Sequence, residues 1–170
     1  MRTPILVMLL VTACAPPAAP TAVTAGIPVP ATAQSATVVR PVDGDTVVLR
    51  GRGTGPLPAR PTRVRLLLVD TPEVFTGPEC FGREAADRTE ELLPDGSEVR
   101  VQADRDPQDR FGRPLLHVWN AAGVEAGQAL LRGGFATVLV VRPNTAYLQD
   151  YREAERKAEQ AGRGLWSACS

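Results

Sequence analysis

The chain has 170 residues, which is enough for one ordinary domain with a sizeable hydrophobic core. Hydrophobic residues make up 44% of it, so a packed globule is expected and disorder of the whole chain is excluded. Because 19 basic residues balance 19 acidic ones, the net charge gives no general attraction for nucleic acid, and any phosphate binding must come from local arginines.

The N-terminal residues predict export. Arg2 precedes an apolar run at 5–11 that is too short to span a membrane, and small residues follow it, as in a secretory signal. The tetrapeptide V-T-A-C at 11–14 is typical of bacterial lipoprotein signals, in which residues 1–13 are removed and Cys14 becomes the lipid-modified first residue. A soluble secreted protein, cut elsewhere in the Ala-rich stretch, is the alternative. We therefore expect a protein of the bacterial cell envelope or a secreted one, monomeric, with membrane contact only through Cys14.

The next stretch predicts a tether. Residues 14–36 consist mainly of Ala, Pro, Thr and Val without charge or periodicity, a composition that cannot pack a core. We therefore expect the folded domain at 37–170. It contains two cysteines, Cys80 and Cys169, and in an exported protein such a pair favours a disulfide; two free thiols are the alternative.

The hydrophobic pattern of the domain predicts a small barrel. In chain order we expect three strands, a helix, two strands, a helix, a short strand and a helix, at 37–42, 46–50, 63–69, 82–93, 98–103, 114–119, 125–132, 135–141 and 145–161. Asp43-Gly44-Asp45 is a turn, Thr71-Pro72 ends the third strand, and the polar stretch 104–112 is expected to be a loop. This order indicates a mainly β (α+β) fold, a five-stranded Greek-key barrel of the oligonucleotide-binding (OB-fold) type with three helices.

Several chemistries are excluded by what the chain lacks. The single histidine, His117, rules out two-histidine mechanisms and histidine-rich metal sites, and its apolar surroundings favour a structural role. No G-x-S-x-G elbow, C-x-x-C pair, Walker loop or G-x-G-x-x-G motif is present. Carboxylates and arginines remain as the candidate functional groups.

These groups gather at turns and strand ends, at Asp43, Asp45, Arg65, Asp70, Glu73, Arg110 and Arg113. Carboxylates beside a backbone carbonyl suit Ca²⁺ or Mg²⁺, and arginines around such an ion suit a phosphoryl group. Mutual pairing of surface acids and arginines, without any site, is the alternative that composition alone favours.

Three motifs change that balance: V-D-G-D-T-V at 42–47, R-L-L-L-V-D-T-P-E at 65–73 and D-R-F-G-R at 109–113. With F-G-R-E-A at 81–85 and G-L-W-S at 164–167, they closely resemble the staphylococcal nuclease (thermonuclease) family over 38–166. The resemblance implies an OB-fold barrel with three helices. It also implies a Ca²⁺-dependent endonuclease that cleaves DNA and RNA and leaves 3′-phosphate ends.

The resemblance assigns a metal site. Asp45 and Asp70 would ligate Ca²⁺ through their carboxylates and Thr71 through its backbone carbonyl. Asp43 would support the metal loop through hydrogen bonds without binding the ion. Two carboxylates balance the two charges of the ion, so an Asp→Asn change is expected to weaken metal binding.

The resemblance also assigns the phosphate and the base. Arg65 and Arg113 would clamp the scissile phosphate, and Glu73 would act as general base or orient the attacking water. In a regular strand Arg65 and Asp70 face opposite sides, so the site requires the chain to bend between them. A bend at Thr71-Pro72 is the one that the sequence indicates.

The substrate pocket departs from the family pattern. Family members can carry tyrosines where this chain has Leu139 and Val141, and a Lys-Tyr pair where it has Arg110 and Phe111. Loss of phenolic hydroxyls predicts weaker nucleotide binding with the metal and phosphate groups intact.

Three other functions compete with a nuclease. One is a catalytically weak or inactive OB-fold module that binds nucleic acid or another anion, although the chain keeps the full set of acids and arginines. Another is a Ca²⁺-binding structural domain built on Asp104, Asp106 and Asp109, which lack the glycine and terminal Glu of an EF-hand loop. A carboxylate-pair glycosidase is disfavoured by the two phosphate-type arginines and the aromatic content of 5%.

Overall fold

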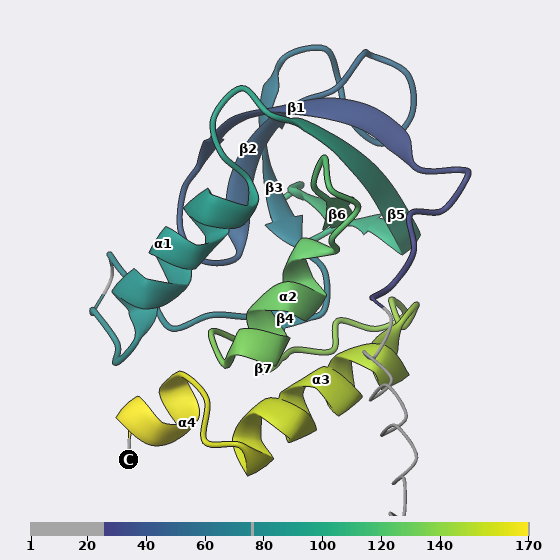
Figure 1. Ribbon diagram of the computed structural model, residues 1–170. Helices are drawn as coiled ribbons and strands as arrows, with labels where there is room; N and C mark the ends of the chain where they lie inside the picture. The colour runs from purple at the N-terminus through teal and green to yellow at the C-terminus, as the bar shows by residue number, and fades with distance from the viewer. Residues whose placement is uncertain (1–25, 76, 170) are drawn as a thin grey trace, which may run out of the picture.

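The computed structural model describes residues 26–75 and 77–169 (Figure 1). Its elements are β1 Gln34–Pro41, β2 Thr46–Arg50, β3 Pro61–Leu66, β4 Val69–Asp70, α1 Gly82–Leu92, β5 Glu98–Gln108, β6 Pro114–Trp119, α2 Ala126–Gly133, β7 Thr137–Val138, α3 Leu148–Gln160 and α4 Leu165–Ala168. In this part of the chain no helix is long and apolar enough to cross a membrane. The predicted signal at 1–13 and Cys14 lie outside the described residues.

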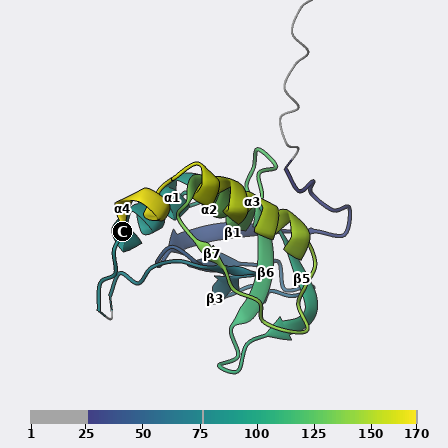
Figure 2. The same ribbon diagram turned by 90° about the horizontal axis from the view of Figure 1, so that it is seen from below.

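Five strands close into a barrel in the order β1-β2-β3-β6-β5, and β5 pairs back onto β1. Neighbouring strands are antiparallel except β3 and β6, which are parallel. The helices lie together on one side of the barrel (Figure 2), and β4 and β7 form a separate two-stranded sheet. The predicted α+β class and the OB-type barrel with three longer helices are confirmed, with the short α4 in addition.

The core fills the barrel and the space beneath the helices. All six residues of β6 are buried, because the barrel interior covers one face and helices cover the other. His117 on β6 is 1% exposed, and its Nδ1 lies 3.0 Å from Tyr151 Oη of α3. That position, in contact with aromatic rings of α3, suits the structural role expected for this histidine.

The predicted tether differs from the structure at residues 26–36. Ile27 is buried, its N donates to Gln128 Oε1 at 3.2 Å, and its carbonyl accepts from Trp119 Nε1 at 2.9 Å. β1 begins at Gln34, so the expected domain start at 37 is too late. The reason is that the side chain of Ile27 packs in the core, and side chains of α2 and β6 form hydrogen bonds with its backbone N and O. Residues 14–25 of the predicted tether lie outside the described residues.

Three predicted boundaries are also wrong. β3 ends at Leu66 instead of 69, because Leu67 and Leu68 turn. β5 continues to Gln108 through the expected loop, where Asn144 Oδ1 accepts from Asp106 N at 2.8 Å. The strand predicted at 135–141 keeps only Thr137–Val138.

Cys80 and Cys169 form the disulfide that the sequence predicts, with Cα atoms 5.7 Å apart. The bond joins the segment before α1 to the C-terminal end of α4. Both cysteines are exposed. The last turn of the chain is therefore fixed to the middle of the domain.

Candidate active site

Two carboxylates from distant parts of the sequence meet at one arginine. Arg65 Nη2 lies 3.0 Å from Asp45 Oδ2 and 2.6 Å from Asp70 Oδ1. Asp45 is the last residue of the turn before β2, Arg65 is on β3, and Asp70 ends β4. The structure thus brings together three of the residues that the sequence motifs singled out.

A turn inside the buried part of the chain makes this contact possible. Leu68 has φ 62°, a left-handed conformation that a leucine adopts rarely. It turns the chain between β3 and β4, and beyond this turn Asp70 lies on the side of Arg65. The bend required by the site therefore lies at Leu67-Leu68, before the Thr71-Pro72 position that the sequence indicated.

The turn that carries Asp45 is held from three sides. Asp43 Oδ1 accepts from the backbone N of Asp45 at 3.1 Å and of Thr46 at 2.7 Å. Thr89 of α1 donates to the carbonyl of Gly44 at 2.6 Å, and a Cβ on Gly44 would collide with the side chain of Thr71. Gly44 therefore lets the Asp45 turn and the Thr71 segment approach closely.

Asp45 is buried and short of positive charge. Burial raises its pKa to about 6, although the guanidinium of Arg65 opposes the shift. Thr71 N donates to Asp45 Oδ2 at 3.4 Å, which places the Thr71 backbone beside the same carboxylate. A divalent cation would supply the missing charge, and carboxylate and carbonyl oxygens are the ligands that Ca²⁺ and Mg²⁺ prefer, so these residues fit a hard cation.

Two carboxylates, those of Asp45 and Asp70, contact Arg65 at this site. Across the described residues, no group of three or more His, Cys, Asp or Glu side chains could hold a metal. An ion between Asp45 and Asp70 would therefore need backbone and water oxygens as well. The acids of the rival calcium loop serve other purposes: Asp104 Oδ2, for example, accepts from the backbone N of Thr145 at 2.6 Å.

Glu73 lies on the exposed segment that follows Asp70 and Thr71. Its backbone is bound to Glu79: the N of Glu73 donates to Glu79 Oε2 at 3.0 Å, and its carbonyl accepts from Glu79 N at 2.9 Å. The Glu73 side chain is exposed, and the described residues give it no ion pair. The carboxylate is thus free to meet a ligand from solvent.

Arg113 is oriented by Asp109 across a tight turn. Asp109 Oδ2 accepts from Arg113 Nε at 2.6 Å, and Asp109 Oδ1 accepts from the backbone N of Phe111 and Arg113, each at 2.9 Å. Partial burial tends to raise the pKa of Asp109, but these hydrogen bonds hold it below its ordinary value. Asp109 therefore stays charged and fixes the direction of the guanidinium.

A pocket of about 460 Å³ joins the two arginines. Both phosphate arginines and all four predicted substrate contacts line it, namely Arg65, Arg110, Phe111, Arg113, Leu139 and Val141. The exposed Phe111 ring lies 4.7 Å from the Arg110 guanidinium carbon and 5.8 Å from that of Arg113. Leu139 is held near Asp70 because its N donates to the carbonyl of Leu68 at 3.1 Å.

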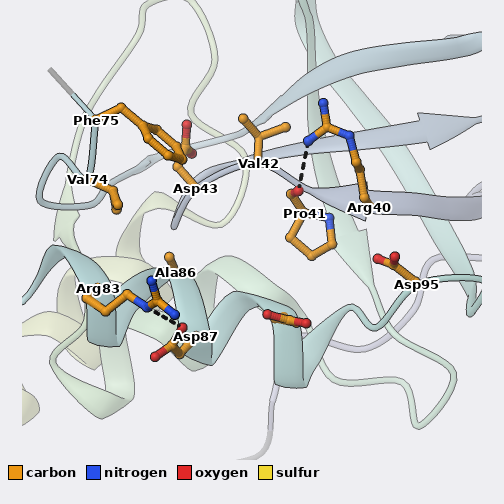
Figure 3. A pocket seen from close by; sticks show the side chains of 11 residues that line it. Arg40, Pro41, Val42, Asp43, Val74, Phe75, Arg83, Ala86, Asp87 and Asp95 are labelled. Atoms are coloured by element: carbon orange, nitrogen blue, oxygen red, sulfur yellow. Dashed lines mark hydrogen bonds and ion pairs between the residues drawn. The ribbon is translucent and has the colours of Figure 1, made fainter.

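A second pocket, of about 300 Å³, lies between the Asp43 turn and α1 (Figure 3). Val74 and Phe75 lie across it from Arg83 and Asp87, which form an ion pair at 3.0 Å. Four acidic and two basic side chains line the pocket. Because this lining carries an excess of negative charge, it does not suit a phosphate, and the pocket beside Arg65 and Arg113 is the candidate for substrate.

Comparison with known families decides the class of the chain. The family model described as staphylococcal nuclease homologue matches residues 63–168, a span that includes Arg65, Asp70, Glu73 and Arg113. The match covers more than half of the 170 residues. The chain belongs to the staphylococcal nuclease family.

Individual relatives of this nuclease family member extend the match to most of the chain. It is 32% identical over 138 residues to a thermonuclease of Staphylococcus hyicus, covering 79% of this chain and 76% of the relative. It is 34% identical over 136 residues to endonuclease YncB of Bacillus subtilis (strain 168), covering 77% and 61%. It is 33% identical to the SPbeta prophage-derived endonuclease YokF of the same strain, of which it spans 43%. The chain thus spans three quarters of the thermonuclease and a smaller share of the two endonucleases.

Sequence reasoning missed residues that support the nuclease family motifs. The sequence places Asp109 in a motif and in the rival calcium loop, and the structure shows that it orients Arg113. Its signal is an Asp three residues before Gly112, which is typical of a turn closed by an Asp side chain. Glu79 and Thr89 carry no local signal, because their partners, Glu73 and Gly44, are set by the fold.

Proposed function

We propose that the protein is a Ca²⁺-dependent endonuclease that hydrolyses phosphodiester bonds of DNA and RNA and leaves 3′-phosphate ends. The observation that carries the proposal is the contact of Arg65 with both Asp45 and Asp70 at the edge of a pocket that contains Arg113. Family membership supports a nuclease, and the relatives named thermonuclease and endonuclease support the same reaction class.

Asp45, Asp70 and the backbone carbonyl of Thr71 are the proposed metal ligands. Burial of Asp45 supports this role, since its carboxylate is buried and shares the single guanidinium of Arg65 with the exposed Asp70, so a cation would add positive charge. When bound, the ion would supply Lewis-acid stabilisation of the charge on the phosphoryl oxygens. Ca²⁺ is proposed over Mg²⁺ because a site with two carboxylates, a carbonyl and waters suits the larger and more flexible coordination of Ca²⁺.

The arginines and Glu73 are the proposed catalytic residues. Arg65 and Arg113 bind the scissile phosphate from two sides and stabilise the negative charge that grows on its oxygens. Glu73 accepts a proton from the attacking water or orients that water, which requires an exposed carboxylate beside the site. Phe111 with Arg110 offers a flat, positively charged contact for a nucleoside, and Leu139 and Val141 add apolar lining to the same pocket.

We further propose that the protein is exported, with Cys14 lipidated in the cell envelope or with the chain secreted, and that it is a monomer. The V-T-A-C tetrapeptide and the disulfide support export. Metabolic labelling with a fatty acid tests lipidation: label in the wild type and none in Cys14→Ser is expected, whereas an unlabelled wild type leaves the secreted form. Size-exclusion chromatography with light scattering tests the monomer.

Digestion of single-stranded DNA and of RNA by the purified protein tests the activity. Cleavage is expected with Ca²⁺ and none with EGTA, and the 3′ ends of the products should ligate to a 5′-phosphorylated adaptor only after a 3′-phosphatase treatment. A folded protein that binds Ca²⁺ and nucleic acid without cleaving either substrate would overturn the proposal in favour of a binding module.

A further inference from the structure

The segment between β4 and α1, residues 71–81, carries Glu73 and runs outside the barrel. At its first end, β4 pairs with β7, where Asp70 lies opposite Thr137. Beyond Glu73 the described residues are mostly exposed, and Phe75 is 70% exposed. Barrel packing therefore does little to fix the position of Glu73.

The far end of the segment is fixed by contacts with Glu79 and α1. Glu79 binds both backbone groups of Glu73, and a Cβ on Gly82, the first residue of α1, would collide with the carbonyl of Glu73. The backbone of Glu73 thus lies directly against Glu79 and the start of α1. Because the residues of the Glu79 contact are exposed, water competes for its hydrogen bonds, and such bonds open readily.

The disulfide lies immediately after Glu79. It joins Cys80 to Cys169, which follows α4. α4 in turn is docked on the end of α2, where Leu165 N donates to the carbonyl of Gly134 at 2.9 Å. The ring of Phe81, the residue after Cys80, stacks on that of Phe135 with centroids 5.4 Å apart. Besides the peptide connection into α1, the disulfide is therefore a second covalent link from the Glu73 segment to the helices, at the end of α4.

From this arrangement we infer that the Cys80–Cys169 disulfide positions Glu73, so that the protein turns over substrate with the bond formed and loses turnover when the bond is reduced. The inference rests on the proposed role of Glu73. Both cysteines are exposed, so a dithiol can reach them. The dithiol gives two electrons and two protons, the disulfide becomes two thiols, and the dithiol closes to its own disulfide.

The expected effect is on turnover more than on binding. A displaced Glu73 no longer accepts the proton of the attacking water or orients that water in the transition state. Arg65, Arg113 and the pocket remain in place to bind substrate. We expect kcat to fall about ten-fold and KM to change less than two-fold. A nuclease with this property is restrained in a reducing cytoplasm and becomes active in an oxidising compartment after export.

The experiment compares the oxidised protein, the protein reduced with dithiothreitol and alkylated, and the Cys80→Ser/Cys169→Ser variant. Kinetics on single-stranded DNA are measured in Ca²⁺ well below the melting temperature, with circular dichroism to show that each form is folded. Both forms without the bond should show the fall in kcat, and an unalkylated reduced sample should recover on reoxidation with glutathione disulfide. A kcat within two-fold of the oxidised value would overturn the inference.

Hydrogen exchange gives a readout that does not depend on activity. The amides of Glu73 and Glu79 should exchange at least ten-fold faster without the disulfide, while the barrel amide of Leu66, which donates to Asp45 O, stays unchanged. If the oxidised protein cleaves nothing, the proposed function fails, and the exchange rates still decide whether the disulfide holds the segment. Equal exchange in both forms would overturn the positioning role.

Glu79 provides a graded variant of the same contact. Glu79→Ala removes the acceptor for Glu73 N, whereas Glu79→Gln keeps an oxygen there. In the oxidised protein we expect Glu79→Ala to lower kcat and Glu79→Gln to restore most of it. In the reduced protein Glu79→Ala should lower kcat further, because the segment then loses both restraints; equal kcat for Glu79→Ala and wild type in the reduced protein would contradict a shared role.

Discussion

Arg65 and Asp70 are five positions apart in the sequence, and their side chains nevertheless touch, with Arg65 Nη2 2.6 Å from Asp70 Oδ1. A regular strand would point them to opposite faces. Leu68, with φ 62°, turns the chain between them and brings Asp70 to the side on which Arg65 also meets Asp45. The candidate site therefore depends on one backbone turn in the core.

Asp45→Asn should weaken Ca²⁺ binding at least ten-fold, because the change removes one of two charges that offset the ion. Isothermal titration calorimetry measures the affinity. The matched control is Asp87→Asn, an exposed acid on α1 that pairs with Arg83. Equal affinities for the wild type and Asp45→Asn would remove Asp45 from the metal site.

Glu73→Gln should lower kcat at least one hundred-fold, because an amide cannot accept the proton of the attacking water. Ca²⁺ affinity should be retained, since the proposed metal ligands are the two carboxylates that contact Arg65, and Glu73 is neither of them. Steady-state kinetics and calorimetry check the two statements. Glu84→Gln, in the first turn of α1, is the control. Activity within a few-fold of the wild type would refute a role in proton transfer.

Arg113→Lys should reduce kcat more than it raises KM. A lysine places a point charge where a planar fork now contacts Asp109 and lines the pocket, so stabilisation of the transition state suffers most. Initial rates over a range of DNA concentrations measure both parameters. Arg105→Lys, on an exposed part of β5, should change neither. A near-normal kcat would place Arg113 outside the reaction centre.

Leu139→Tyr should lower KM, because a phenolic hydroxyl in the pocket can bond the nucleotide where leucine cannot. The expected decrease is about three-fold to ten-fold, in line with one hydrogen bond of about 0.5–1.5 kcal/mol. KM is measured at fixed salt and Ca²⁺. Val124→Tyr, at an exposed site remote from the pocket lining, is the control. An unchanged or higher KM would mean that Leu139 does not face the bound nucleotide.

Thr89→Val should destabilise the protein by about 1–2 kcal/mol, because the buried carbonyl of Gly44 loses its donor. The looser Asp45 turn should also bind Ca²⁺ more weakly. Urea denaturation and calorimetry measure the two effects. Thr62→Val is the control, since its hydroxyl contacts Arg60 O at an exposed position. Loss of stability with full Ca²⁺ affinity would show that α1 does not support the metal turn.

Local patterns predicted the barrel because its strands alternate or bury β-branched residues, and most of the turns carry Gly, Pro or Asp. The motif residues were also found from the sequence, since each lies at a turn or strand end. The turn at Leu68 could not be predicted, because a leucine with positive φ is set by surrounding packing.

Long-range contacts explain the other differences. The extension of β5 through Asp106 depends on Asn144, 38 positions away. The docking of Ile27 depends on Gln128 and Trp119, 101 and 92 positions away. No local window of sequence contains both members of such pairs.

Residues 66–69, three leucines and a valine, are each at most 2% exposed, and the next residue is Asp70 of the candidate site. The same five consecutive positions thus anchor the interior and aim a functional carboxylate. Substitutions selected here for heat resistance would alter cleavage, and those selected for cleavage would alter heat resistance. A library meant to change one property alone should spare this stretch and vary the exposed faces of β1 and α3 instead.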